Sequence, residues 1–284
     1  MSRTAGLYKS PDELRAMIRP GLVTAAALAA VRGAIAVGVS TRELDAIAEG
    51  VIRDSGGTPN FQLEPGYRHT LCTSINDAVV HGVPSELRIA AGDIVSIDCG
   101  AAIDGWNGDA AFTVVLPDPD RPDVVSRREA LNAATERSLW AGIAALATAS
   151  VVNDIGAAVE ASIEASGGYG IIEDFAGHGI GRSMHEDPEV YNFRMRGGSP
   201  KVKPGLVVAI EPMITLGGIE THELADGWTQ VTDDGSDAAH WEHSVAVHAD
   251  GIWVLTSEDG GAAGLAQFGV RPVAIPSNLK SVVR

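Results

Sequence analysis

Residues 94–115 read IVSIDCGAAIDGWNGDAAFTVV, and this stretch decides much of the fold. Asp104-Gly105 is a favoured two-residue turn between antiparallel strands. With that turn, Asp98 pairs with Ala111, and Asp109 lies on the same sheet face, diagonal to Asp98. The pattern predicts a β-hairpin whose two strands carry neighbouring carboxylates.

Two carboxylates on one sheet face repel each other unless a positive charge lies between them. A solvated acidic face is the simplest alternative. The flanking residues Ile94, Ile97 and Val114 nevertheless indicate strands that are largely buried. A divalent cation is a natural counter-charge for a buried pair of this kind, so the hairpin is a candidate metal site.

The chain also shows internal self-similarity. Residues 44–57 and 155–168 share their apolar spacing and end in Ser-Gly-Gly, a helix-end signal, at an offset of 111 positions. Residues 92–98 (GDIVSID) resemble 205–211 (GLVVAIE) at an offset of 113 positions. Chance is the alternative, because glycine, valine and isoleucine are common. We interpret the matches as a repeat in which each half has two helices, then strands, and a carboxylate at the end of an apolar strand.

Two such halves predict an α+β fold with pseudo-twofold symmetry, in which helices cover the convex face of one curved antiparallel sheet. The predicted boundaries are a tail at 1–10, one domain at 11–256 and a C-terminal extension at 257–284 packed on the surface. The halves of the domain are expected at about 11–118 and 119–256.

Local signals predict where helices begin. Ser-x-x-Glu capping boxes, in which the two side chains satisfy free backbone donors, predict helix starts at Ser10, Ser40 and Ser126. Pro20 is expected to kink or break the first of these helices, because proline lacks the backbone donor.

Composition bounds the class of protein. The chain has 284 residues and a formal net charge of −16, which argues against nucleic-acid or anionic-membrane partners. Two cysteines, Cys72 and Cys99, exclude a disulfide scaffold and fit a reducing compartment. No apolar leader is visible at the N-terminus, and the apolar stretch at 22–31 is shorter than a membrane span. These features predict a cytoplasmic globular protein.

The second half of the chain supplies further side chains of metal-ligand type. His178 is flanked by glycines in AGHGIG, where close backbone approach is possible. Glu211 ends an apolar strand, and Glu242 lies in another strand by alternation with Ser244. Each of the three is a weak signal alone, since a lone histidine is more often structural and a buried carboxylate only needs some partner.

Taken in order, these residues resemble the methionine aminopeptidase family of metallopeptidases, in its short type I form. The resemblance covers about residues 12 to 256. It rests on the order Asp98, Asp109, His178, Glu211 and Glu242, and on the segments Ser74-Ile75-Asn76, Val80-His81-Gly82-Val83-Pro84, Gly177-His178-Gly179-Ile180-Gly181-Arg182, His185-Glu186-Asp187-Pro188 and Ile210-Glu211-Pro212-Met213.

The resemblance implies the pita-bread fold and a site for two divalent ions, with Co, Mn, Fe and Zn all compatible with an oxygen-rich ligand set. It implies that Asp109 and Glu242 bridge the ions, that Asp98 completes one site, and that His178 and Glu211 complete the other. A water or hydroxide between the ions would be the nucleophile for amide hydrolysis.

Three catalytic roles are implied in the same way. His81 is expected near the scissile nitrogen, His185 at the developing oxyanion or substrate carbonyl, and Glu211 as a proton shuttle as well as a ligand. Packed or loop histidines are the alternative for His81 and His185. The remaining candidates His222, His240 and His243 are expected to be structural or supporting residues.

The resemblance also implies an apolar methionine pocket. The matching positions are Phe61, Tyr67, Cys72, Met184 and Trp228, for which core packing is the alternative. Two positions depart from the family pattern, because Met184 and Glu64 stand where an aromatic residue is common. Since a glutamate cannot line a dry pocket unpaired, Glu64 is expected to point outward or to bind the substrate's free amine.

The implied function is removal of the N-terminal methionine from nascent proteins and peptides whose second residue is small. The implied partner is the nascent polypeptide, with contact to the ribosome left open, and with no nucleic acid or membrane partner. A prolidase-like Xaa-Pro aminopeptidase of the same fold is the main alternative. A non-catalytic binding protein of that fold is a second one, although such proteins typically lose metal ligands and carry basic tails.

Overall fold

The computed structural model describes residues 6–276, so parts of the predicted tail and C-terminal extension lie outside the described residues. The helices are α1 (Pro11–Ala34), α2 (Thr41–Asp54), α3 (Pro122–Leu146), α4 (Asn153–Ser166) and α5 (Ala262–Leu265), with 3-10 turns at Phe61–Leu63 and Ala266–Phe268. The strands of the first half are β1 (Thr58–Pro59), β2 (Leu71–Ile75), β3 (Ala78–Val80), β4 (Ile94–Ile103) and β5 (Trp106–Val115). The later strands are β6 (Gly170–Ile171), β7 (Gly177–Gly179), β8 (Glu186–Val190), β9 (Val207–Ile210), β10 (Met213–Thr215), β11 (Thr221–Glu223), β12 (Gln230–Thr232), β13 (Ala238–His240), β14 (Glu242–His248) and β15 (Gly251–Val254).

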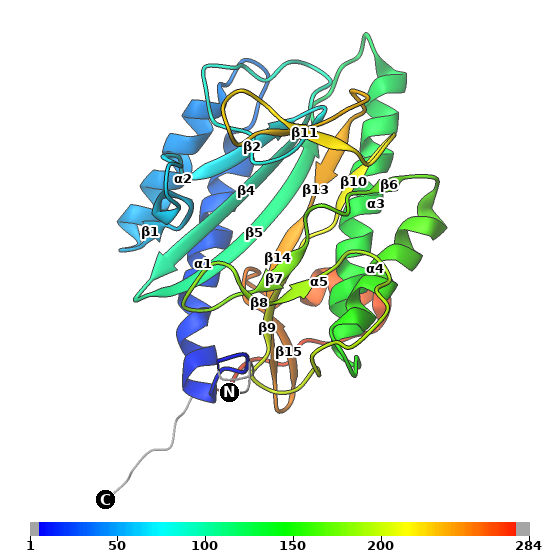
Figure 1. The fold of residues 1–284 in the computed structure, drawn as a ribbon. Coiled ribbons are helices and arrows are strands. Elements are labelled where there is room, and N and C mark those ends of the chain that lie inside the picture. The colour runs from blue at the N-terminus through cyan, green and yellow to red at the C-terminus, as the bar shows by residue number, and fades with distance from the viewer. Residues whose placement is uncertain (1–5, 277–284) are drawn as a thin grey trace, which may run out of the picture.

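A nine-stranded antiparallel sheet forms the centre of the molecule (Figure 1). Its main path runs β1-β4-β5-β14-β9-β7-β8, with β2 paired to β4 and β15 paired to β14. At the centre of this path, the hairpin strands β4 and β5 of the first half lie next to β14 and β9 of the second half. Each half of the chain therefore forms one side of the sheet. This arrangement is the curled, pseudo-symmetric sheet that the repeat predicts.

The predicted hairpin register is confirmed. The turn lies at Asp104-Gly105, Ile103 pairs with Trp106, and Asp98 pairs with Ala111. Both turn residues have positive φ, 52° for Asp104 and 71° for Gly105, as a tight hairpin turn of this type requires.

The sheet is not the only one in the described part of the chain. One additional three-stranded sheet joins β13, β10 and β6, and a second joins β11, β12 and β3. The prediction of one curved sheet describes the main sheet but omits these two small sheets, which segments between the strands of the main sheet form.

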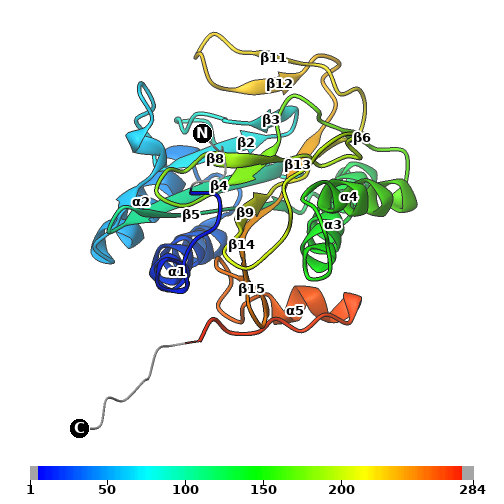
Figure 2. The ribbon, with the colours of Figure 1, turned by 60° about the horizontal axis from the view of Figure 1, so that its bottom comes forward.

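Helices cover one face of the main sheet in two pairs, α1 with α2 and α3 with α4 (Figure 2). The opposite face is left to the shorter strands and loops, among them the β11–β12 hairpin. Each helix pair comes from one half of the chain, so the layers follow the repeat.

The capping boxes at Ser10 and Ser40 are present as predicted, and α1 and α2 begin there. The predicted start at Ser126 is wrong. Helix α3 begins at Pro122, after Arg121, which makes no side-chain cap, and Ser126 lies inside the helix. Proline at the first helical position is itself a start signal, because its missing donor has no partner to lose there.

Pro20 does not break α1, which is one continuous helix from Pro11 to Ala34. Helix α1 packs closely against the β4–β5 hairpin around Pro20, and these contacts stabilise the helix there. A Cβ added at Gly108 would lie 2.8 Å from the Pro20 carbonyl carbon, so helix and strand are in close contact there. Thr24 also donates to the Gly108 carbonyl at 3.1 Å and accepts from the Ala101 amide at 3.1 Å.

Among the described residues, α1 is long and apolar enough by length and composition to cross a membrane. Half of its apolar window is buried inside the molecule, which is typical of a core helix. The apolar stretch at 22–31 lies within this helix.

The described part of the C-terminal extension does not lie wholly on the surface. Leu265 is fully buried in the main core, and Ile275 packs in a smaller apolar cluster with Leu14 and Met17 of α1. The Val273 carbonyl accepts from His248 Nε2 at 2.7 Å, which ties the extension to β14.

Candidate metal centre

One row of residues crosses the middle of the sheet and defines the site. Cys72 on β2 pairs with Asp98 on β4, Asp98 pairs with Ala111 on β5, and Ala111 pairs with Glu242 on β14. Residues that pair across a sheet lie on the same face. Asp109, two positions along β5 from Ala111, shares that face. The small Ala111 side chain therefore leaves space between three carboxylates.

The second half of the chain adds two side chains from the other side. Glu211 follows β9, and its Oε1 lies 3.4 Å from Nε2 of His178 on β7. Its other oxygen, Oε2, lies 3.7 Å from Nε2 of the buried His240. Asn192 donates to the Glu211 carbonyl at 3.0 Å and so fixes the backbone where β9 ends.

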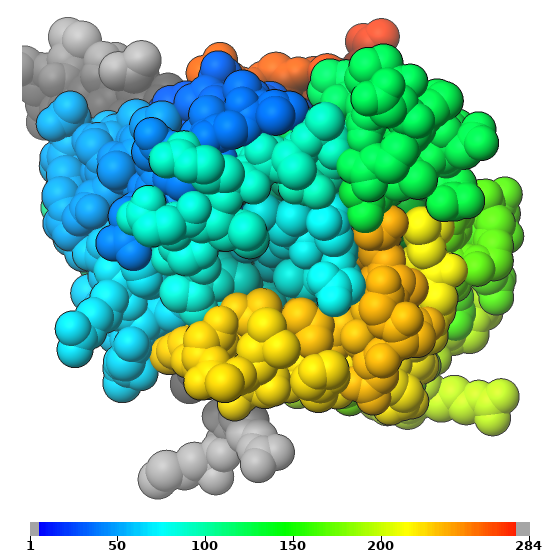
Figure 3. Space-filling model, turned by 90° about the horizontal axis from the view of Figure 1, so that it is seen from above, coloured from blue at the N-terminus to red at the C-terminus, as the bar shows by residue number. Residues whose placement is uncertain are grey.

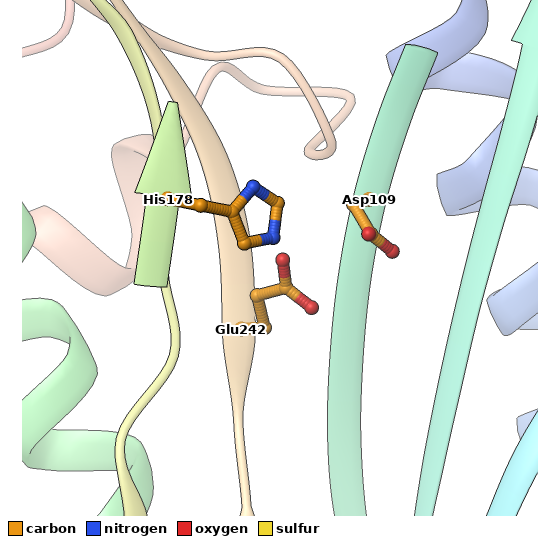
Figure 4. A group of neighbouring side chains, drawn as sticks. All are labelled: Asp109, His178 and Glu242. Carbon is orange, nitrogen blue, oxygen red and sulfur yellow. The ribbon is translucent and has the colours of Figure 1, made fainter. Parts of the chain in front are cut away.

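Figure 4 shows Asp109, His178 and Glu242 pointing toward one another from three separate strands. One ligand atom of each lies within 4.8 Å of the others, a spacing suited to a single cation. Asp98 and Glu211 line the same cavity, so all five predicted ligands are brought together.

Several carboxylate oxygens of the site are buried and lack a hydrogen-bond donor from residues 6–276. Among the described residues, buried oxygens of Asp98, Asp109 and Glu242 have no hydrogen-bond partner. Buried polar atoms are normally paired, and an unpaired set points to an absent ion. Four carboxylates and one imidazole form an oxygen-rich ligand set suited to divalent transition metals, so the residues fit a metal centre.

Burial raises the pKa of all four carboxyl groups in this metal-free site. The pKa of Asp98 rises to about 7, and burial with neighbouring carboxylates raises those of Asp109, Glu211 and Glu242 well above their ordinary values. Burial lowers the pKa of His178 to about 4, which favours the neutral ring that a metal requires.

His81 and His185 line the same cavity as the five ligand-type side chains. His81 has φ of 59°, a rare conformation for a residue with a side chain, and its ring packs edge-on against Phe175. The His185 ring lies 4.4 Å from the His178 ring. Burial is the main reason that the pKa of each of His81 and His185 is lowered.

The predicted pocket residues also converge. The cavity has a volume of about 170 Å³, and Phe61, Tyr67, Cys72, Met184 and Trp228 all line it. The first four form a buried apolar cluster, with the half-buried Trp228 packed against it. Trp228 comes from the loop between β11 and β12, which borders the surface of the first half in the space-filling view (Figure 3).

The structure narrows the alternatives that the sequence left open for two residues near the site. Glu64 lines the cavity rather than pointing away from it, and its half-buried side chain has no hydrogen-bond or ion-pair partner among the described residues. His240, expected to be a structural or supporting residue, lies beside Glu211, with 3.7 Å between Nε2 and Oε2. Its position two residues before the ligand Glu242 was the available signal.

The comparisons with known proteins agree with this geometry. The model of metallopeptidase family M24 matches residues 15–249. Methionine aminopeptidase 1 of Mycobacterium tuberculosis is 49% identical over 257 residues, covering 87% of this chain and 94% of the relative. The crystal structure of methionine aminopeptidase from Thermotoga maritima matches with a TM-score of 0.83 and 33% identity, covering 88% of this chain and 99% of that one.

A prolidase from Pyrococcus horikoshii also matches, with a TM-score of 0.68 and 21% identity, covering 90% of this chain and 65% of that one. At this identity the likeness concerns the fold alone. The family match and the relative from M. tuberculosis, each covering most of the chain, concern the sequence as well. The chain therefore belongs to metallopeptidase family M24 and, within it, to the methionine aminopeptidases.

Proposed function

We propose that this protein removes the N-terminal methionine from peptides and nascent proteins whose second residue is small, as a type I methionine aminopeptidase. The observation that carries the proposal is one cavity lined both by five side chains of metal-ligand type and by an apolar pocket. A hydrolytic centre and a methionine-sized binding site are thus adjacent.

Two divalent ions, drawn from Co, Mn, Fe or Zn, are proposed as cofactors. Asp109 and Glu242 would bridge them, with Asp98 at one ion and His178 with Glu211 at the other. The four carboxylates match the charge of two divalent ions. When bound, such ions supply Lewis acidity and lower the pKa of water, so that hydroxide is available at neutral pH.

The remaining polar side chains act on the substrate itself. His185 donates a ring N–H to the substrate carbonyl, where negative charge develops in the transition state. His81 lies where it can handle the proton of the scissile nitrogen, and its lowered pKa keeps the ring neutral near pH 7. Glu211 carries a proton from the attacking water to the leaving amine.

The methionine side chain is proposed to occupy the apolar part of the cavity. Phe61, Tyr67 and Cys72 supply buried aromatic and thiol walls, and Met184 adds a flexible thioether that adapts to another unbranched side chain. Glu64 at the same cavity is free to bind a cationic group of the substrate, such as its free amine. Nascent chains in the cytoplasm are the proposed substrates, with contact to the ribosome left as an outcome for experiment.

Peptide hydrolysis with each metal in turn tests this function. We expect metal-dependent release of methionine from Met-Ala-Ser and little cleavage of Ala-Pro peptides. Preferential cleavage of Ala-Pro would assign the protein to the Xaa-Pro aminopeptidases instead. If no tightly held divalent ion and no hydrolysis of either peptide were found, the non-catalytic alternative would replace both.

A further inference from the structure

A largely buried ion pair connects the segment before α1 to the turn between β7 and β8. The Lys9 side chain is only 4% exposed, and its Nζ lies 2.6 Å from Oε2 of Glu186. The backbone N–H of Lys9 donates to the Gly205 carbonyl at 2.7 Å, so the lysine is held at its backbone as well. Lys9 lies outside residues 15–249, which the family model matches.

The other carboxylate oxygen of Glu186 accepts a hydrogen bond from the turn that precedes it. Oε1 accepts from the Ser183 backbone N–H at 3.0 Å, while Oε2 faces Lys9. A Cβ added at Gly181 would lie 2.7 Å from Glu186 Oε1 and 2.7 Å from Lys9 Cε, so the ion pair packs directly on the turn backbone. One carboxylate therefore links the N-terminal segment to both ends of the turn.

The turn at 181–185 connects β7 to β8 and carries two cavity residues. Met184 is 8% exposed and packs in the apolar pocket, whereas the next residue, His185, reaches the cavity from an exposed position. On the far side, the Asn107 side chain donates to the carbonyls of Gly181 and Arg182 at 3.1 and 3.2 Å. These contacts hold the start of the turn, and Glu186 holds its end.

We propose that Lys9 is a positioning residue for hydrolysis, which acts through Glu186 to hold Met184 and His185 in register with the metal centre. The inference rests on the proposed function, since it assigns His185 to the substrate carbonyl. A histidine on an exposed turn needs fixed anchors, because a displacement of about 1 Å can cost roughly a hundredfold in rate.

The consequence of removing Lys9 follows from charge. Without the ammonium, the Glu186 carboxylate is left partly buried without a cation, and it relaxes toward solvent. The Ser183 contact moves with it, and so does His185. His178 lies before the turn, and the backbone of β7 is held by pairing with both β8 and β9, which does not require the Lys9 side chain. Turnover should therefore fall while metal content stays unchanged.

A double-mutant cycle between Lys9→Met and His185→Ala tests the proposal in the full-length, metal-loaded enzyme. We expect Lys9→Met to lower kcat about tenfold with a smaller change in KM, and Lys9→Arg to restore most of it. In the His185→Ala background, Lys9→Met should change kcat less than twofold, because the catalytic group that Lys9 positions is already gone, and displacement of the pocket residue Met184 should affect mainly KM. If Lys9→Met does not fold, Lys9→Gln replaces it in the same cycle.

Arg194→Met is the matched control, since Arg194 makes an exposed ion pair with Glu160 on a loop beyond β8. It should leave kcat within twofold of the wild type. Additive effects of Lys9→Met and His185→Ala, or a normal kcat for Lys9→Met, would overturn the positioning role. Inactivity of the wild type on methionyl peptides would instead refute the proposed function, so the two failures are distinguishable.

Discussion

The two halves of the sheet place carboxylates at the same centre by different means. In the first half, Asp98 and Asp109 lie on one continuous hairpin of two ten-residue strands, β4 and β5. In the second half, the matching strands are four residues in β9 and seven in β14, and Glu211 lies just past the end of β9. The Ser244 hydroxyl donates to the Asp109 carbonyl at 2.7 Å and joins the halves at the site.

The difference shows how a repeated frame yields an unsymmetrical catalyst. Symmetry explains why carboxylates from both halves converge, because each repeat places an acid directly after a run of apolar strand residues, although β4 continues past Asp98 to Ile103. The interruption after Ile210 frees the second half to add His178, from β7, beside Glu211. The first half supplies oxygen ligands alone, so the two ions would have unequal surroundings.

The largest expected effect comes from removing a ligand at the junction of the halves. We expect Asp109→Asn to abolish most metal binding and to lower kcat/KM by roughly a thousandfold, because several kcal/mol of transition-state stabilisation depend on the metal. Metal content by mass spectrometry and hydrolysis of Met-Ala-Ser measure both effects. Val115→Ala, at the other end of the same strand and outside the cavity, is a useful control. Normal metal content in Asp109→Asn would contradict the role of Asp109 as a ligand where the two halves of the sheet meet.

A second prediction separates metal binding from proton handling. His81→Ala should retain both ions and lower kcat by about a hundredfold, the usual scale for a lost acid–base group. The same two assays apply. Unchanged turnover would remove His81 from the mechanism, whereas parallel loss of metal would make it a supporting residue for the ligands.

A third prediction concerns pH. In the metal-free protein the pKa of Asp98 is raised by burial from 3.8 to about 7, so the folded state holds a proton that the unfolded state releases. Stability is then greatest below pH 4 for this group and is lost as pH rises from about 4 to 7. Divalent metal replaces the proton and should restore stability at pH 7.

Thermal unfolding with EDTA and with Mn²⁺ across this pH range measures the effect. Asp98→Asn serves as the control, since it removes one of the four buried carboxyl groups with a raised pKa and should make the decline of the metal-free profile smaller. A wild-type profile in EDTA that does not decline between pH 4 and 7, relative to Asp98→Asn, would contradict the account.

The sequence predicts the hairpin well because its signals are local. The turn at Asp104-Gly105 sets the register, and the register places Asp98 beside Asp109. The capping boxes of α1 and α2 are local in the same sense. The ligands from distant segments could be predicted only through the resemblance to a known family, because no spacing rule relates His178 or Glu242 to the hairpin.

What the sequence missed depends on tertiary contacts. Pro20 is tolerated because α1 packs closely on Gly108, and Ser126 is bypassed because Pro122 begins the helix earlier. The contacts of His240 with Glu211 and of Lys9 with Glu186 join residues far apart in the chain. No periodicity or motif encodes such pairs.

The smallest expected effect concerns Glu64 at the cavity. Glu64→Gln should reduce the preference for methionyl peptides with a lysine near the scissile bond over those with a glutamate by about two- to fivefold, the scale of a partly exposed charge contact. Competition between Met-Ala-Lys and Met-Ala-Glu measures the ratio. Glu49→Gln on α2, which does not line the cavity, should leave it unchanged. An unchanged ratio in Glu64→Gln would exclude a role in recognising a lysine side chain there.

The most direct test of the central claim is a crystal structure of the Mn²⁺-loaded protein with anomalous difference data. The account predicts two anomalous peaks in the cavity, surrounded by Asp98, Asp109, His178, Glu211 and Glu242. Saturating Mn²⁺ that leaves the cavity without a peak, or that binds only elsewhere, would contradict it.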